Sequence, residues 1–351
     1  MYSDEIQDAL EEEGVQVGDV VRVERDGTSY EGRLMPRSAQ GETGVLVLKL
    51  DNGYNTGIAY TDDTDIALVE EHQAESANDV EVPEPDPEKP DIAILHTGGT
   101  IASTVSYEEG GVKPALEPKD LLRLYPELFD EANVDSEVIA QMLSEDMEPA
   151  HWQAIAEAVA EHREKDGVII GHGTDTMQYT AAALTFMLEN IDVPVVLVGA
   201  QRSSDRPSSD AALNLLSAVE FIKEGVPGVY FCMHARMSDD TAAVHHGARV
   251  RKMHTSRRDA FQSIDTRPAA VVDHGAGEVT FTGDPETPDG AFQLRTALEE
   301  DVGLLKTRPG LETDDIEHHS GRDGLVVEGT GLGHLPVNAF DEHTEHHEDI
   351  L

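Results

Sequence analysis

Two short segments rich in glycine and threonine carry the side chains best suited to chemistry. His96–Thr100 directly follows the apolar run Ile92–Leu95, and Gly171–Thr176 follows a second apolar run that begins at Gly167. Both runs have the length of buried strands, and ligands of a parallel α/β sheet bind beyond the carboxyl ends of its strands. Each segment would therefore place hydroxyl groups and backbone N–H groups at the mouth of one sheet.

Hydroxyl and backbone N–H groups at a glycine-rich turn suit either phosphate binding or nucleophilic catalysis. Phosphate binding is the first alternative, because such turns hold phosphates at the start of a helix. Neither segment has the G-x-x-x-x-G-K-[ST] or the G-x-G-x-x-G spacing, so the pattern disfavours a nucleotide site. A purely structural turn explains the glycines. It does not explain two threonines, an aspartate and a histidine gathered at the two strand ends, and we favour a catalytic site.

Three stretches resemble the signature motifs of the L-asparaginase/glutaminase family. They are ILHTGGTIAS at 94–103, GHGTDTM at 171–177 and VGAQRSSDRPSSD at 198–210. The resemblance extends over about residues 91–335. It implies an α/β fold with a parallel sheet and crossover helices, and hydrolysis of a side-chain amide as the activity.

The resemblance also implies roles for individual residues. Thr97 matches the first catalytic threonine of the family, and Thr174 with Asp175 matches the second catalytic pair. Lys252 matches the catalytic lysine. These roles are chemically reasonable, because a threonine hydroxyl attacks only when a base removes its proton, and burial or nearby charge can keep a lysine neutral enough to serve. Tyr107 is a further candidate, as an activator of Thr97; which threonine attacks first stays open.

Substrate binding is implied for a partly overlapping set. Ser144 and Glu145 occupy the place of substrate-contacting residues, together with Thr174 and Asp175. The carboxylates of Asp175 and Glu145 would hold the α-ammonium group of a free amino acid by charge-assisted hydrogen bonds. Backbone N–H groups of the glycine turns would stabilise the oxyanion. Plain asparaginases commonly have glutamine at the position of Glu145, so we expect this residue to bear on specificity.

A second resemblance narrows the family. The strand-rich N-terminal segment with its acidic linker, and Ser144–Met147 ahead of Trp152, are similar to the D subunits of archaeal glutamyl-tRNA(Gln) amidotransferases. This similarity implies hydrolysis of L-glutamine to glutamate and ammonia. The ammonia would pass to a partner, the E subunit of the amidotransferase, which uses ATP and Mg²⁺ to amidate Glu-tRNA(Gln).

The same similarity bears on partners and cofactors. It implies a homodimer within a heterotetramer, with the tRNA held mainly by the partner, and neither a cofactor nor a metal is expected in this chain. Two other interpretations stay open. One is a free-standing L-asparaginase, and the other is a non-catalytic scaffold subunit.

The elements that must position these residues fall into four zones. Residues 1–74 contain short strands with glycine turns, which predict a small SH3-like β-barrel. Residues 75–90 hold prolines among acids and predict an extended linker. Apolar runs and helical spacing alternate through 91–325, which predicts an asparaginase-like parallel sheet with crossover helices. Residues 326–351 are expected to begin a C-terminal α/β domain that is cut short compared with the family.

The chain is strongly acidic, with 70 Asp and Glu against 25 Lys and Arg and a formal net charge of −45. Such a surface repels phosphate backbones, which excludes a free-standing polyanion-binding module. Hydrophobic residues make up 39%, too many for a disordered chain. Spread over a folded surface, the charge is tolerated in molar salt, where the screening length falls to ~3 Å. We therefore expect a salt-adapted cytoplasmic protein.

Three smaller features complete the sequence. The only cysteine, Cys232, lies in an apolar run and is expected to be a buried strand thiol. The N-terminus lacks a signal peptide pattern, and no apolar stretch reaches membrane-spanning length. A basic run stands out in so acidic a chain, and it indicates either local ion pairs or a surface for the partner or tRNA. Its members are Arg249, Arg251, Lys252, Arg257 and Arg258.

Overall fold

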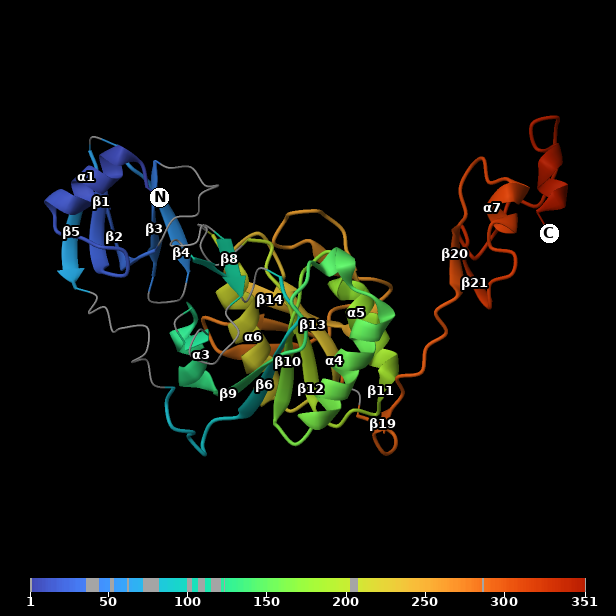
Figure 1. Ribbon diagram of the computed structural model, residues 1–351, viewed down its shortest axis with the longest axis horizontal. Coiled ribbons are helices and arrows are strands. Elements are labelled where there is room, and N and C mark those ends of the chain that lie inside the picture. Colours follow the sequence, from blue (N-terminus) through green and yellow to red (C-terminus); the bar gives the residue numbers. More distant parts are fainter. Residues whose placement is uncertain are drawn as a thin grey trace. The chain divides into compact units, whose positions relative to one another are not determined.

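The computed structural model describes most of the chain, in two compact units, residues 1–296 and 297–351 (Figure 1). The residues outside the description are 1, 36–43, 51–53, 62, 72–81, 100–102, 107–110, 115–120, 123, 203–207, 286 and 351. Tyr107, the candidate activator of Thr97, is among them. Each unit is described by itself below.

The first unit begins with a small domain in which one helix packs on a five-stranded antiparallel sheet of order β4-β3-β2-β1-β5. Its elements are α1 (Asp4–Glu12), β1 (Val20–Arg25), β2 (Thr28–Leu34), β3 (Val45–Lys49), β4 (Asn55–Ala59) and β5 (Asp65–Glu70). Asp26 and Gly27 both have positive φ and form the two-residue β1–β2 hairpin turn. The strand-rich barrel-like domain was predicted. Helix α1 was not; it buries Ile6 and Leu10, one turn apart, on the sheet.

The catalytic domain is built on an eight-stranded sheet of order β18-β17-β14-β13-β12-β10-β6-β9. The strands are β6 (Asp91–His96), β9 (Asn133–Val138), β10 (Gly167–Gly171), β12 (Pro194–Val198), β13 (Gly228–His234), β14 (Thr241–His246), β17 (Ala270–Asp273) and β18 (Glu278–Phe281). Strands β9 to β13 of this order pair in parallel, and β14, β17 and β18 add antiparallel partners. The sheet therefore confirms the predicted asparaginase-like architecture, with an antiparallel extension that the sequence pattern did not indicate.

Helices cover both faces of this sheet (Figure 1). The helices are α3 (Pro126–Glu131) and α6 (Ala211–Lys223) on one face, and α4 (Pro149–Glu161) and α5 (Met177–Met187) on the other. Strand β6 sends Ile92 and Ile94 into the first core and Ala93 and Leu95 into the second. Burial on both faces explains why such strands are continuously apolar in sequence.

Short elements at the strand ends complete the first unit. The pairs are β7 (Ser103–Ser106) with β8 (Gly111–Pro114), β11 (Leu188–Glu189) with β19 (Gln293–Leu294), and β15 (Val250–Lys252) with β16 (Phe261–Ser263). Two single 3-10 turns are η2 (Ser144–Asp146) and η3 (Gly247–Arg249). The hairpin β15–β16 and the turn η2 matter most for function, because they carry Lys252 and Ser144.

The second unit, residues 297–351, has its own small core of Leu305, Leu311 and Ile350. Its elements are β20 (Val302–Lys306), α7 (Thr313–Glu317), β21 (Gly324–Glu328) and η4 (Glu345–Asp349). Strand β20 pairs in parallel with β21. The unit thus begins earlier than residue 326, where the sequence placed the C-terminal domain, because a strand pair spans that point.

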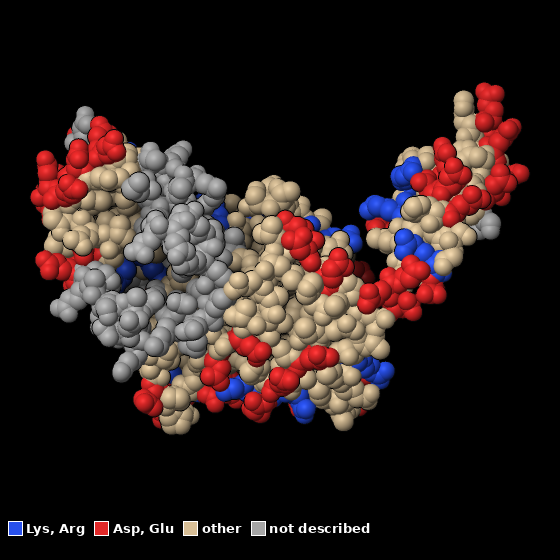
Figure 2. Space-filling view, in the orientation of Figure 1, with Lys and Arg blue, Asp and Glu red and all other residues tan. Residues whose placement is uncertain are grey.

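Surface features agree with the composition. Figure 2 shows acidic side chains scattered over the described surface of each unit in this view, with fewer basic ones among them. The described part of the linker is not free in solvent: the Asn133 amide donates to the carbonyl of Asp86 at 2.8 Å. Cys232 is buried, as predicted, and burial raises the pKa of its thiol. Among the described residues no helix is long and apolar enough to cross a membrane.

Candidate active site

The two glycine turns at the carboxyl ends of β6 and β10 are in direct contact. Thr97 donates both its backbone N–H and its hydroxyl to the carbonyl of Gly171, each at 3.0 Å. Gly99 has φ +86°, and a Cβ there would come within 2.7 Å of the Gly173 nitrogen. Only glycine allows this approach. The pairing of β6 with β10 therefore brings together two motifs that lie far apart in sequence.

Lys252 reaches the second turn from a distant part of the sequence. Its Nζ lies 2.9 Å from the Thr174 hydroxyl and 2.8 Å from an Asp175 carboxylate oxygen. The lysine side chain is 10% exposed, whereas that of Asp175 is 68% exposed. Phe261, on the paired strand, has its ring centre 5.9 Å from Nζ and shields this nitrogen from one side. A base in contact with a hydroxyl nucleophile and an orienting carboxylate is the arrangement that activates serine and threonine enzymes.

The backbone of Lys252 is fixed by a residue that the sequence did not single out. Gln178 Oε1 accepts the Lys252 backbone N–H at 2.6 Å. Gln178 lies in the first turn of α5, four residues after Thr174. No local pattern marks it, because its partner is a backbone N–H of a hairpin distant in sequence.

His172 supports the same turn through its ring nitrogens. Its Nδ1 donates to the Gly173 carbonyl at 2.7 Å, which leaves Nε2 to accept from the Thr180 hydroxyl at 2.9 Å. Thr180 in turn accepts from the indole N–H of Trp152 at 3.1 Å. Burial lowers the pKa of His172 to about 4, and the ring is neutral at pH 7. The histidine thus positions the turn and is not a general base.

The substrate-binding candidates differ in their surroundings. Ser144 is buried in η2, and a Cβ on Gly173 would come within 2.8 Å of its Cβ. The Thr176 hydroxyl donates to the Ser144 carbonyl at 2.5 Å, so η2 is tied to the second turn. Glu145 is exposed on the same η2 turn. The η2 turn with Ser144 and Glu145 is therefore tied to the turn that carries Thr174 and Asp175, and the Glu145 side chain is exposed.

The basic run turns out to be paired locally in large part. Arg257 forms a bidentate ion pair with Asp259. Arg249 pairs with Asp265 at 3.4 Å, and Arg258 pairs with Asp239. The interpretation as local ion pairs therefore holds for these three arginines. Lys252 is the member of the run that enters the site.

Comparison with family models gives two matches. A model described as asparaginase, N-terminal, matches residues 91–286. A model described as GatD N-terminal domain matches residues 15–69. The two matches coincide with the α/β sheet domain and with the small antiparallel domain.

Curated relatives match nearly the whole chain. The D subunit of glutamyl-tRNA(Gln) amidotransferase from Methanobrevibacter smithii is 41% identical over 97% of this chain and 79% of its own length. The protein of the same name from Methanopyrus kandleri is 45% identical over 95% of this chain and 76% of its own length.

Solved structures are similar in fold. The thermostable L-asparaginase from Thermococcus kodakarensis has a TM-score of 0.63 and 34% identity, with 71% of this chain and 73% of that chain covered. A probable cytoplasmic L-asparaginase from Campylobacter jejuni has a TM-score of 0.58 and 32% identity, covering 70% and 77%. Together with the geometry of the two threonine turns, these matches establish that the chain belongs to the asparaginase family, among the D subunits of glutamyl-tRNA(Gln) amidotransferases.

Proposed function

We propose that this chain hydrolyses L-glutamine to glutamate and ammonia, and that the ammonia converts Glu-tRNA(Gln) to Gln-tRNA(Gln) on a partner subunit. The observation that carries the proposal is the contact of Lys252 Nζ with both the Thr174 hydroxyl and Asp175. The names of the curated relatives supply the tRNA-dependent context.

The chemistry follows the threonine-nucleophile scheme. A threonine oxygen bonds to the side-chain amide carbon, and the carbonyl oxygen becomes an oxyanion that the backbone N–H groups of the glycine turns stabilise. The C–N bond then breaks, and the nitrogen leaves as ammonia with the proton taken from the hydroxyl. Water hydrolyses the acyl-enzyme and frees glutamate. Thr97, Thr174, Lys252 and Asp175 are the catalytic group in this scheme, and Lys252 is the base.

Substrate recognition in this scheme uses carboxylates and hydroxyls. Asp175 and Glu145 hold the α-ammonium group, and Ser144 and Thr174 line the same pocket mouth. Asp175 therefore has two tasks, because one of its oxygens contacts Lys252 at 2.8 Å and its exposed side chain leaves the other for the substrate.

Partners and cofactors divide between two kinds of subunit. In this scheme the E subunit of the amidotransferase binds ATP and Mg²⁺. It also makes most of the tRNA contacts, because this chain, with a formal net charge of −45, is unsuited to hold a polyanion alone. The chain acts as a homodimer within a heterotetramer. Threonine–lysine chemistry requires no metal, so EDTA should leave ammonia release intact while it stops the tRNA-dependent step.

The test is ammonia release from L-glutamine and L-asparagine, with and without the E subunit and Glu-tRNA(Gln), in high salt. We expect glutamine to be preferred and its turnover to rise when both partners are present. Preferred turnover of asparagine that ignores the partners would identify a free-standing asparaginase instead. Absence of any amidase activity in the full complex would identify a scaffold.

A further inference from the structure

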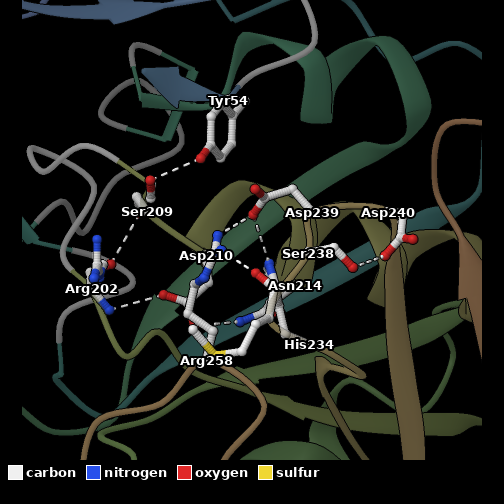
Figure 3. A network of polar contacts seen from close by, with 12 residues as sticks. Tyr54, Arg202, Ser209, Asp210, Asn214, His234, Ser238, Asp239, Asp240 and Arg258 are labelled. Carbon is white, nitrogen blue, oxygen red and sulfur yellow. Dashed lines mark hydrogen bonds and ion pairs between the residues drawn. The ribbon is translucent and has the colours of Figure 1, made fainter. Parts of the chain in front are cut away.

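Asp239, between β13 and β14, is the centre of a polar network that the catalytic scheme does not use (Figure 3). Its side chain is 30% exposed, whereas its partners His234 and Arg258 are buried. Its carboxylate accepts hydrogen bonds from the Arg258 guanidinium and from His234 Nε2, the latter at 3.2 Å. Tyr54 is a third hydrogen-bonding neighbour. Burial alone would raise the pKa of Asp239, but the hydrogen bond from His234 and the charge of Arg258 outweigh it and lower the pKa. Asp239 is therefore a carboxylate held between the Arg258 guanidinium and the His234 ring.

The first arm of the network reaches the hairpin that carries Lys252. Arg258 lies in the segment between β15 and β16, is 8% exposed, and also donates to the Met237 carbonyl. Lys252 ends β15 and pairs with Phe261 at the start of β16. The hairpin is thus anchored at its far end to the β13–β14 connection, through charged hydrogen bonds that are stronger than neutral ones.

The second arm runs through His234 and Asn214. His234 is completely buried, and its Nδ1 lies 2.7 Å from Asn214 Oδ1. The Asn214 amide nitrogen donates to the Gly199 carbonyl at 3.0 Å and to Asp210 at 3.1 Å, so the amide orientation is fixed and Oδ1 must accept. The two ring nitrogens of His234 therefore face Asn214 Oδ1 on one side and the Asp239 carboxylate on the other, and the ring connects the two.

The second arm ends against Thr174. A Cβ on Gly199 would come within 2.8 Å of the Thr174 methyl group and 3.0 Å of the His172 carbonyl. The backbone of Gly199 is therefore the wall behind Thr174. A shift of the Asn214 side chain would move the Gly199 carbonyl that it holds, and with it the packing of Thr174.

We propose that Asp239 is a positioning residue that fixes Lys252 and Thr174 relative to each other, by holding the β15–β16 hairpin through Arg258 and the Gly199 wall through His234 and Asn214. The inference rests on the proposed function for its kinetic test only. The geometry of the Lys252–Thr174 contact needs no turnover and can be tested by itself.

The kinetic test compares Asp239→Asn with a matched control, Asp240→Asn. Asp240 is the next residue and is also exposed, but its carboxylate accepts from Ser238 at 2.7 Å and contacts neither Arg258 nor His234. We expect Asp239→Asn to lower kcat by about 10- to 100-fold, the scale of a displacement of about 1 Å in a catalytic pair. KM should change less than kcat, because two of the four substrate-binding residues, Ser144 and Glu145, are held by η2. The control should keep the wild-type kcat.

The structural test measures acylation of Lys252 by an amine-reactive acetyl ester, followed by peptide mass spectrometry, with exposed Lys306 as the internal reference. In the wild type Nζ is shielded and bonded on two sides, so acylation of Lys252 should be slow compared with Lys306. We expect Asp239→Asn to raise the relative rate and Asp240→Asn to leave it unchanged. Because no substrate is involved, failure of the proposed function would show as an inactive wild type and would not affect this readout.

Two further results decide the proposal. Arg258→Lys keeps the positive charge and should retain more kcat than Arg258→Gln, and Asp239→Asn combined with Arg258→Gln should cost less than the two single effects added, because both break one contact. Wild-type kcat and wild-type Lys252 acylation in Asp239→Asn would overturn the proposal. So would equal losses in Asp239→Asn and Asp240→Asn, or full additivity in the double variant.

Discussion

The turns after β6 and β10 have similar sequences but different chemical surroundings. Each follows a buried strand, contains glycine and carries a threonine at the sheet edge. Thr97 is almost completely buried and donates its hydroxyl to the Gly171 carbonyl. Thr174 is partly exposed and contacts a lysine that comes from another part of the chain. Similar local sequence therefore provides two hydroxyls, and tertiary contacts give only the second a base among the described residues.

The histidines that precede the two turns show the same contrast. His172 uses both ring nitrogens, one on Gly173 and one on Thr180. His96 is buried as well, yet neither of its nitrogens has a hydrogen-bond partner within the described part of the chain. Burial lowers the pKa of both rings to about 4. The second turn is thus held by a series of side-chain hydrogen bonds through His172, and the first is held mainly by its backbone contacts.

The largest expected loss of activity comes from removing the contact between Lys252 and Thr174 at the second turn. Lys252→Ala removes the base and Thr174→Val removes its hydroxyl partner, so each should lower glutamine turnover by about 1,000-fold. The double variant should be no worse than either single one, because the two groups act as a unit. Steady-state ammonia release in the assembled complex measures this. Lys306→Ala, on an exposed lysine paired with Glu328, is the control and should behave as wild type.

The first turn is tested by Thr97→Val. Gly171 keeps the backbone N–H of Thr97 as a donor, so unfolding free energy should change by no more than about 1 kcal/mol. Turnover should nevertheless fall by about 100-fold or more, the scale expected for loss of a catalytic group. Urea unfolding and ammonia release, measured on the same preparation, separate the two. Normal turnover would remove Thr97 from the catalytic group.

The histidine contrast predicts unequal effects on stability. His172→Phe should destabilise the fold by about 1–3 kcal/mol at pH 7, because Thr180 and Gly173 each lose a buried partner. His96→Leu should cost less than about 1 kcal/mol, since no hydrogen bond within the described residues is lost. Urea unfolding of both variants at one salt concentration measures the difference, and equal losses would contradict the contrast.

The smallest effect is in the pH dependence. Because burial lowers the pKa of His96 to about 4, the unfolded state binds more protons than the folded state between about pH 6.5 and 4. The stability that the neutral ring contributes is present above that window and is lost as the pH falls through it. His96→Leu should therefore flatten the fall in stability from pH 7 to 4. Unfolding curves at several pH values check this, and an unchanged slope would argue that His96 does not titrate in this range.

Much of the site could be predicted because the motif residues directly follow the strands that position them. The strands ending at His96 and Gly171 and the helix over Met177–Met187 follow from apolar runs and helical spacing. Gln178 could not be assigned from the sequence, because its partner is a backbone N–H of a hairpin distant in sequence. Helix α1 was missed because nothing local shows which sheet its Ile6 and Leu10 will cover.

The sequence by itself determined which reactive groups the site contains. They are two threonine turns, an aspartate and a lysine, and the sequence also determined the buried sheet that carries the turns. Those features are local, because buried strands and glycine turns can be recognised from residues that are adjacent in the sequence. Only the tertiary structure decided which hydroxyl meets Lys252 and which meets a backbone carbonyl. It also decided that Asp239 would lie between Arg258 and His234. Such contacts depend on strand order and loop packing, which join residues with no fixed spacing along the chain.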